Sequence, residues 1–233
     1  MTINQFDDEV SMKIQAVIFD LDGTLIDSMG IWEDVDRVFL GRRNIAVPPD
    51  LFDDVSAGNN FQGLAQHFKD RFQLSESIDE IMKEWTEQVV EFYVHHIPIK
   101  DGVRELLAFL AKNSIPMAIG TSNSVFLTES VLNRHGLMPY FQYIVTGADV
   151  ECGKPFPDIY LKTAQLLQVK PELCLVIEDS LQGVQAGKAA GMSVVAISDE
   201  FSRKEEDKIR EESDYFFDNF QQIQNLLMKK LEV

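Results

Sequence analysis

The sequence has few cysteines and no long apolar run, and each shortage excludes a class of protein. Its two cysteines, Cys152 and Cys174, are not spaced as a pair, so the sequence indicates neither a disulfide scaffold nor a cysteine zinc site. No apolar stretch is long enough to span a bilayer. The first ten residues are polar and acidic, without the basic start and apolar stretch of a secretion signal. These features predict a cytoplasmic protein that does not enter a membrane.

Positive charge is also scarce. Lys and Arg number 21 against 38 Asp and Glu, which gives a formal net charge of -17. A field of this sign repels polyanions, so we expect neither nucleic acid nor an anionic membrane as a partner. The same field opposes a phosphorylated substrate. A site for such a substrate must therefore reverse the sign locally with a lysine, a helix N-terminus or a metal ion.

The pattern of apolar residues indicates an α/β fold. Short apolar runs end in polar or small residues, as strands buried on both faces of a sheet do; they span 14–19, 117–119, 143–145, 174–177 and 193–197. Segments with helical periodicity lie between and after them, at 103–112, 125–135, 158–167 and 181–190. This alternation predicts a parallel sheet with helices on both faces. In such a sheet ligands bind at the carboxyl ends of the strands.

The stretch from Ser28 to His95 interrupts the alternation. It contains only helical patterns, near 31–42, 61–72 and 78–94. A chain of 233 residues can hold one core and a smaller insertion. We therefore predict a catalytic core of residues 1–27 and 96–233. An all-helical cap of residues 28–95 would be inserted after the first strand, as a lid over the strand ends.

Two carboxylates follow the first predicted strand, in Asp20-Leu21-Asp22-Gly23-Thr24. With one residue between them, both can lean toward the same cleft. One carboxylate can attack phosphorus and form an aspartyl phosphate. The second can protonate the leaving oxygen and later deprotonate water. The same pentapeptide also suits a structural acidic turn, in which Gly23 supplies a positive φ.

Two further motifs can hold a phosphate group. Gly120-Thr121-Ser122-Asn123 follows the second run, and hydroxyls and backbone N–H groups at a helix N-terminus bind phosphate oxygens. The same residue types also cap helices. In Gly153-Lys154-Pro155 the lysine can neutralise phosphate charge, although a lysine in a turn can also be simply solvated.

Acidic residues also close the fourth run, in Glu178-Asp179-Ser180. Mg²⁺ prefers a few carboxylates together with waters and phosphate oxygens. These side chains therefore suit a magnesium site opposite Asp20. The alternative is an acidic N-cap that the helix dipole stabilises.

Together the four motifs supply a nucleophile, an acid/base, a phosphate clamp, a countercharge and a metal site. Their order resembles the four motifs of the haloacid dehalogenase superfamily, and the resemblance spans nearly the whole chain. It is greatest to the branch of β-phosphoglucomutase, phosphoglycolate phosphatase and the sugar-phosphate phosphatases. The resemblance implies a Rossmann-like doubly wound core with a mobile helical cap, and a Mg²⁺-dependent enzyme that transfers phosphoryl groups.

The resemblance also implies roles at the acidic positions. Asp20 would be the nucleophile and a ligand of Mg²⁺. Asp22 would be the acid/base, with its backbone carbonyl on the metal. Asp179 would complete the protein ligands, and Glu178 would be a ligand or lie next to one.

The same resemblance implies that three further residues would hold the transferring phosphoryl group. They are Thr121, Ser122 and Lys154. Every group that the chemistry needs is therefore present, which disfavours a catalytically silent binding protein on this fold.

Two positions separate a phosphatase from a mutase. The mutases carry a histidine shortly after the first motif and an arginine in the cap loop, where this chain has Trp32 and Phe61. Without those polar partners a second phosphate would be poorly held. We therefore expect hydrolysis of a small phosphorylated metabolite rather than the β-phosphoglucomutase reaction, in a protein whose mobile lid is compatible with a monomer. Trp32, Phe61 and Trp85 also have the spacing of residues that fill a helical core, and specificity would reside in the cap loop around 56–63.

Overall fold

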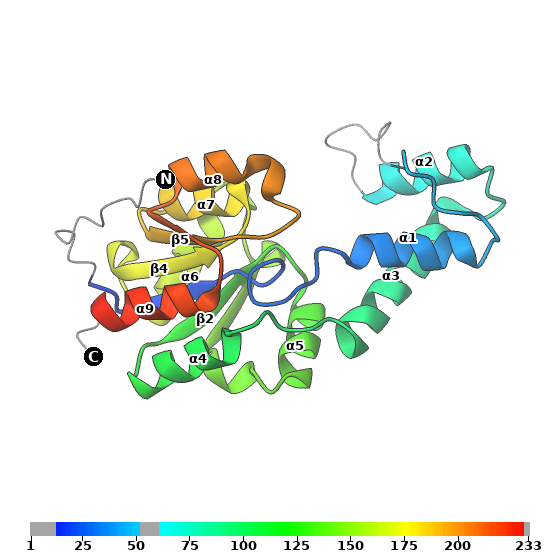
Figure 1. The fold of residues 1–233 in the computed structure, drawn as a ribbon. Helices are drawn as coiled ribbons and strands as arrows, with labels where there is room; N and C mark the ends of the chain where they lie inside the picture. The colour runs from blue at the N-terminus through cyan, green and yellow to red at the C-terminus, as the bar shows by residue number, and fades with distance from the viewer. Residues whose placement is uncertain (1–12, 52–60, 231–233) are drawn as a thin grey trace. The chain divides into compact units, whose positions relative to one another are not determined.

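The structure is a computed structural model that describes residues 13–51 and 61–230. These residues divide into two compact units (Figure 1). One unit lies within Met1–Asp27 and Pro98–Val233 and contains all the strands; the other lies within Ser28–Ile97 and is helical. Most of the predicted cap loop around residues 56–63 falls outside the described residues. None of the helices in the described part of the chain combines the length and hydropathy needed to cross a bilayer.

Six parallel strands form one sheet in the first unit, in the order β3-β2-β1-β4-β5-β6. The strands are β1 (Ala16–Phe19), β2 (Met117–Thr121), β3 (Tyr143–Thr146), β4 (Cys174–Glu178), β5 (Ser193–Ile197) and β6 (Tyr215–Phe217). β1 lies between β2 and β4, and the register aligns Phe19 with Ile119 and with Ile177. The three strands therefore end side by side. The chain order also reverses direction at β1, which is where open α/β sheets bind their ligands.

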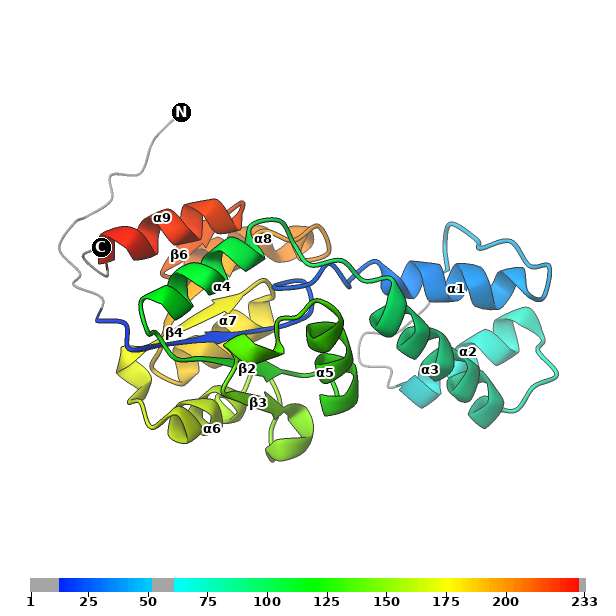
Figure 2. The ribbon, with the colours of Figure 1, turned by 90° about the horizontal axis from the view of Figure 1, so that it is seen from below.

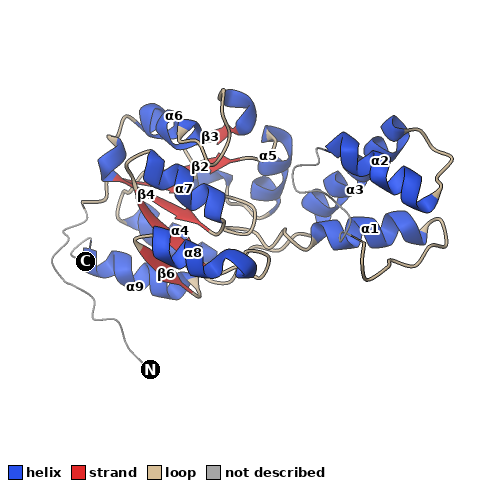
Figure 3. Cartoon of the chain, turned by 90° about the horizontal axis from the view of Figure 1, so that it is seen from above, coloured by secondary structure: helices blue, strands red, loops and turns tan. Residues whose placement is uncertain are grey.

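Helices cover both faces of this sheet, which confirms the predicted doubly wound fold. α6 (Asp158–Leu167) and α7 (Leu181–Ala189) lie on one face, and α4 (Val103–Lys112) and α9 (Phe220–Lys230) lie side by side on the other (Figures 2 and 3). α5 (Val125–Arg134) follows β2, and α8 (Glu206–Glu212) packs against α7. The segment from Ser202 to Ser213 is mostly polar. Within it α8 buries Ile209, which is 1% exposed.

The sequence patterns did not predict β6 or α9. β6 has three residues, none fully buried, at the edge of the sheet, so it lacks the apolar run of a central strand. α9 does carry a helical signal, because Phe220, Ile223 and Leu227 are spaced three and four apart and are buried.

The second unit consists of α1 (Ile31–Gly41), α2 (Phe61–Phe72) and α3 (Ile78–His95). Trp85 of α3 is buried at its centre, with ring centroids 5.5 Å from Phe39 and 4.9 Å from Phe68. The predicted core role of Trp85 is thereby confirmed. The side chains of Trp32 and Phe61 lie outside the described residues.

Candidate active site

Asp20 is held at the carboxyl end of the central strand. Its backbone N–H donates to the Ile177 carbonyl of β4 at 3.0 Å, so the ladder continues one residue beyond β1. The residue is 6% exposed. One of its oxygens, Oδ1, lies 2.5 Å from the ammonium nitrogen of Lys154. Residues 134 positions apart in the sequence are thus in direct contact.

Lys154 joins two carboxylates. Besides Asp20, its ammonium group donates to Glu178 Oε1 at 2.6 Å. The lysine side chain is only 6% exposed, and its nitrogen also lies 5.0 Å from the centre of the Tyr160 ring. Lys154 is therefore a buried ion-pair partner, which rules out the alternative of a solvated turn lysine.

Glu178 is fully buried and has donors on both of its oxygens. Oε1 accepts from Lys154 and, at 2.9 Å, from the Tyr160 hydroxyl. Oε2 accepts from the backbone N–H groups of Asp179 and Ser180 at 2.8 and 2.9 Å and from the Ser180 hydroxyl at 3.1 Å. Gly183 makes room for this carboxylate, because a Cβ there would lie 1.6 Å from Oε1.

Asp179 is the third buried carboxylate of the site. Its Oδ1 accepts from the Thr24 hydroxyl at 2.8 Å, and its Oδ2 lies 3.4 Å from the Ser202 hydroxyl. Gly23, with φ of +80°, allows this close approach, since a Cβ on it would lie 2.4 Å from Oδ2. The N-cap of α7 is Ser180, whose hydroxyl accepts from Gly183 N–H at 3.1 Å. Asp179 is therefore not the helix cap that the alternative interpretation required.

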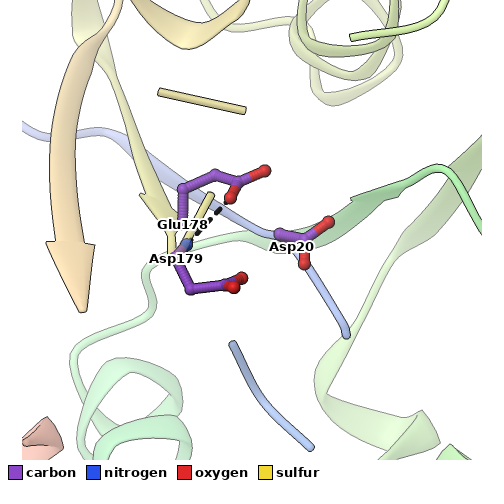
Figure 4. Close-up of side chains that lie close together, drawn as sticks. All are labelled: Asp20, Glu178 and Asp179. Carbon is purple, nitrogen blue, oxygen red and sulfur yellow. Dashed lines mark hydrogen bonds between the residues drawn. The ribbon is translucent and has the colours of Figure 1, made fainter. Parts of the chain in front are cut away.

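The three carboxylates converge. One oxygen each from Asp20, Glu178 and Asp179 lies within 4.8 Å of the others (Figure 4). Together with Lys154 they place three acidic groups against one ammonium group. A hard cation with oxygen ligands, such as Mg²⁺, would balance the remaining charge.

Burial shifts the protonation of these groups. It raises the pKa of Asp20 well above its ordinary value, against the opposing charge of Lys154. Burial and then the charge of Glu178 raise the pKa of Asp179 to about 8. Burial acts the same way on Glu178, but the Lys154 ammonium group and the surrounding donors hold its pKa below the ordinary value. Burial opposes the charge of Lys154, yet the two carboxylates raise its pKa well above the usual range. Lys154 and Glu178 are therefore held in their charged forms, whereas burial disfavours the charged forms of Asp20 and Asp179.

Asp22 lies in the turn after β1, next to the loop that follows β2. Its Oδ2 accepts from the side-chain amide of Asn123 at 2.8 Å. Thr121 ends β2 and is 1% exposed; its hydroxyl accepts from the Asn123 N–H at 3.1 Å. Ser122 is exposed. The N-cap of α5 is Ser124, so neither Ser122 nor Asn123 serves as the cap.

Sequence reasoning missed four residues that contact this site. They are Tyr160, Asn123, Ser202 and Thr24, which bond to Glu178, Asp22 and Asp179 as described above. Thr24 and Asn123 belonged to the motifs but had no assigned role. Nothing in the local pattern marks Tyr160, which reads as a core residue of α6, or Ser202 in a polar segment.

The sequence also matches a known family of enzymes. Residues 17–197 match the haloacid dehalogenase-like hydrolase family. The chain belongs to this family. The predicted superfamily and the prediction of an enzyme are thereby confirmed.

Several relatives of this haloacid dehalogenase-like hydrolase are named phosphatases. Hexitol phosphatase A of Escherichia coli is 34% identical over 193 residues, covering 80% of this chain and 84% of that protein. The phosphorylated carbohydrates phosphatase of Thermotoga maritima is 31% identical over 179 residues, covering 77% and 82%. The bifunctional riboflavin kinase/FMN phosphatase of Arabidopsis thaliana is 33% identical over 191 residues, but the match covers only 48% of that longer protein.

Solved structures show the same fold. A Thermotoga maritima protein proposed to be a β-phosphoglucomutase is 28% identical with a TM-score of 0.80, covering 93% of this hydrolase and 99% of that chain. A mutant of CbbY from Rhodobacter sphaeroides, in complex with xylulose-(1,5)bisphosphate, is 25% identical with a TM-score of 0.71, covering 89% and 95%.

Proposed function

We propose that this hydrolase is a Mg²⁺-dependent phosphatase of a small phosphorylated metabolite, a sugar phosphate or similar phosphomonoester. The observation that carries the proposal is the Lys154 ammonium group, which bridges Asp20 and Glu178 at the ends of two neighbouring strands. A phosphoryl group beside Asp20 would meet this positive charge in a protein that is otherwise strongly acidic. The relatives named as hexitol and carbohydrate phosphatases support the substrate class.

The carboxylate cluster fits a magnesium ion. We propose Asp20, Asp179 and the backbone carbonyl of Asp22 as its protein ligands. Both oxygens of Glu178 already accept hydrogen bonds, so this residue would orient Lys154 and lie beside the ligands. The ion would supply charge neutralisation for the nucleophile and the phosphoryl oxygens.

The residues of the chain then divide the chemistry between them. A carboxylate oxygen of Asp20 forms a bond to phosphorus while the bond from phosphorus to the substrate oxygen breaks. That oxygen keeps the electron pair and takes the proton of the Asp22 carboxyl group, so the alcohol leaves. Asp22 next takes a proton from water as the water oxygen attacks phosphorus. The bond to Asp20 breaks, its carboxylate is restored, and inorganic phosphate is released.

Thr121 and Lys154 would hold the phosphoryl oxygens during both steps. Thr121 ends the strand next to β1, and its hydroxyl is already oriented by the Asn123 N–H. Ser122 is exposed on the same loop, and we propose that it contacts the substrate there. Fixed donors of this kind stabilise charge that develops in the transition state.

The helical unit would act as a lid. The two segments that connect it to the first unit are hydrogen-bonded to each other: Asp27 N–H donates to the Pro98 carbonyl, and Lys100 N–H to the Leu25 carbonyl, both at 3.0 Å. A short paired connection is suited to hinge motion. Closure of such a lid would exclude water during transfer to Asp20 and select the leaving group.

A mutase of the β-phosphoglucomutase type is the second candidate. It is favoured by the likeness to the Thermotoga maritima protein, which extends over 93% of this chain. A mutase would convert hexose 1-phosphate to hexose 6-phosphate without releasing phosphate. Our proposal requires phosphate release instead.

A substrate panel tests the proposal. The purified protein would be assayed with and without Mg²⁺ on hexose and hexitol phosphates, phosphoglycolate, nucleotides, pyrophosphate and p-nitrophenyl phosphate. We expect Mg²⁺-dependent phosphate release that is lost in Asp20→Asn and retained in Asp101→Asn, a control at an exposed aspartate. Equal inactivity of the wild type and Asp20→Asn across the panel would favour a binding protein, and efficient interconversion of hexose phosphates would favour the mutase. Size-exclusion chromatography would test the expected monomer.

A further inference from the structure

Asn123 connects the loops that follow β1 and β2. Its side-chain amide nitrogen donates to Asp22 Oδ2 at 2.8 Å, across 101 residues of sequence. Its backbone N–H donates to the Thr121 hydroxyl at 3.1 Å. One residue therefore touches both the proposed acid/base and a proposed phosphate-holding residue.

The orientation of the Asn123 amide is determined by its surroundings. The side-chain oxygen accepts from the Ser124 backbone N–H at 2.7 Å, while the side-chain nitrogen faces the Asp22 carboxylate. Rotating the amide by half a turn would set a donor against a donor and an acceptor against an acceptor. The start of α5 thus fixes which atom of Asn123 meets Asp22.

Helix capping does not explain this residue. The cap of α5 is Ser124, whose hydroxyl accepts from Leu127 N–H at 3.3 Å. Asn123 precedes the cap, and its amide nitrogen points to the neighbouring loop. The side-chain nitrogen of Asn123 therefore bonds to the Asp22 carboxylate and has no part in capping the helix.

We infer that Asn123 is a positioning residue that holds the Asp22 carboxyl group where it can protonate the leaving oxygen. This inference rests on the proposed function. Asp22 lies in the turn after β1, and its carboxylate accepts a hydrogen bond from the Asn123 side-chain amide at 2.8 Å. This bond restricts rotation of the carboxyl group. General acids need to be within hydrogen-bond reach of the atom they protonate.

The dependence of rate on the leaving group tests the inference. Phenolate is a poorer leaving group than p-nitrophenolate and depends more on protonation, while the two aryl phosphates are similar in shape. General acid catalysis contributes about 10²–10⁴-fold, and we expect Asn123→Ala to lose part of it. The value of kcat/KM, which reports the first phosphoryl transfer, should fall about tenfold or more for phenyl phosphate and less than about threefold for p-nitrophenyl phosphate.

Three further variants separate positioning from a structural role. Ser124→Ala removes the helix cap of the same loop but keeps the N–H that orients Asn123, so both substrates should change equally. Asn123→Asp keeps the shape of the side chain but sets a carboxylate against Asp22, and it should reproduce the selective loss. Adding Asn123→Ala to Asp22→Ala should cause no further loss, because residues that act through one group are not additive.

The outcomes distinguish this inference from the proposed function. Equal losses on both aryl phosphates in Asn123→Ala, or a further selective loss in the Asp22→Ala background, would overturn the positioning role while leaving the phosphatase intact. Absence of any phosphate release by the wild-type protein would overturn both.

Discussion

The two units of the chain differ in how their buried charged groups are paired. In the sheet unit, the buried groups Asp20, Glu178, Asp179 and Lys154 are matched by ion pairs and hydrogen bonds. In the helical unit, Asp36 is 4% exposed, and among residues 13–51 and 61–230 its Oδ2 has no hydrogen-bond partner. Burial of a carboxylate therefore does not identify a site. Convergence of complementary groups from several strand ends does.

The comparison predicts opposite effects of removing charge in the two units. In the sheet unit, loss of one group leaves the others unbalanced. In the helical unit, loss of the charge relieves a cost. The following substitutions test this difference, from the largest expected effect to the smallest.

Lys154→Met should have the largest effect. It leaves Asp20 and Glu178 buried together without their countercharge, and breaking a buried ion pair in this way costs about 3–5 kcal/mol of unfolding free energy. Phosphatase activity should fall about a thousandfold or more, because the clamp on the phosphoryl group is also lost. Urea unfolding and steady-state kinetics measure the two effects. Lys162→Met is the matched control, since Lys162 is only partly buried and its ammonium group donates to the Asp149 carbonyl rather than to a buried carboxylate. Unchanged stability of Lys154→Met would contradict the geometry of the cluster.

Asp36→Asn should stabilise the protein at high pH. Burial and then the charge of Glu33 raise the pKa of Asp36 from 3.8 to about 7. The folded state therefore binds this proton more tightly than the unfolded chain, so the contribution of Asp36 to unfolding free energy declines as the pH rises between these two values. The full loss is present above pH 7. It corresponds to at most roughly 4 kcal/mol.

Denaturant unfolding at two pH values measures this effect. At pH 8 the variant should be more stable than the wild type, and the difference should shrink on acidification toward pH 4. Glu87→Gln, at an exposed position of the same unit, should show no such pH dependence. A stability difference that is constant with pH would show that Asp36 is not the titrating group.

The substitutions Gly183→Ala and Gly41→Ala compare the two units, because each adds one methyl group at a glycine. At Gly183 the new methyl group would collide with Glu178 Oε1, and overpacking of this kind costs about 1–3 kcal/mol. Activity should fall with it, because Glu178 holds Lys154 in place. At Gly41, in α1, nothing lies within 4 Å of the added Cβ, and alanine should stabilise the helix by about 0.5–1 kcal/mol. Thermal unfolding and p-nitrophenyl phosphate turnover would separate the two. Similar behaviour of both variants would contradict the contact between Gly183 and Glu178.

The sequence predicted the parallel sheet because its central strands are buried on both faces and their runs are almost wholly apolar. It also predicted that Asp20, Lys154 and the Glu178-Asp179 pair belong to one site, because each follows a strand or precedes a helix at the same edge. It did not predict β6, whose three residues lie at the sheet edge and are only partly buried.

Contacts between loops could not be predicted in the same way. The bond from Asn123 to Asp22 depends on the register of β1 against β2 and on the amide being oriented by Ser124. The bond from Tyr160 to Glu178 depends on which face of α6 meets the sheet. A linear pattern contains the residue types but not these directions.

The central claim is that the Asp20 carboxylate becomes phosphorylated during turnover. Quenching the reaction with hydroxylamine and sequencing the peptides by mass spectrometry tests it directly, because hydroxylamine converts an acyl phosphate to a hydroxamate. We predict a hydroxamate at Asp20 that requires both a phosphorylated substrate and Mg²⁺. A hydroxamate at Asp22 or Glu178 instead, or rapid phosphate release with no modified aspartate, would contradict the account.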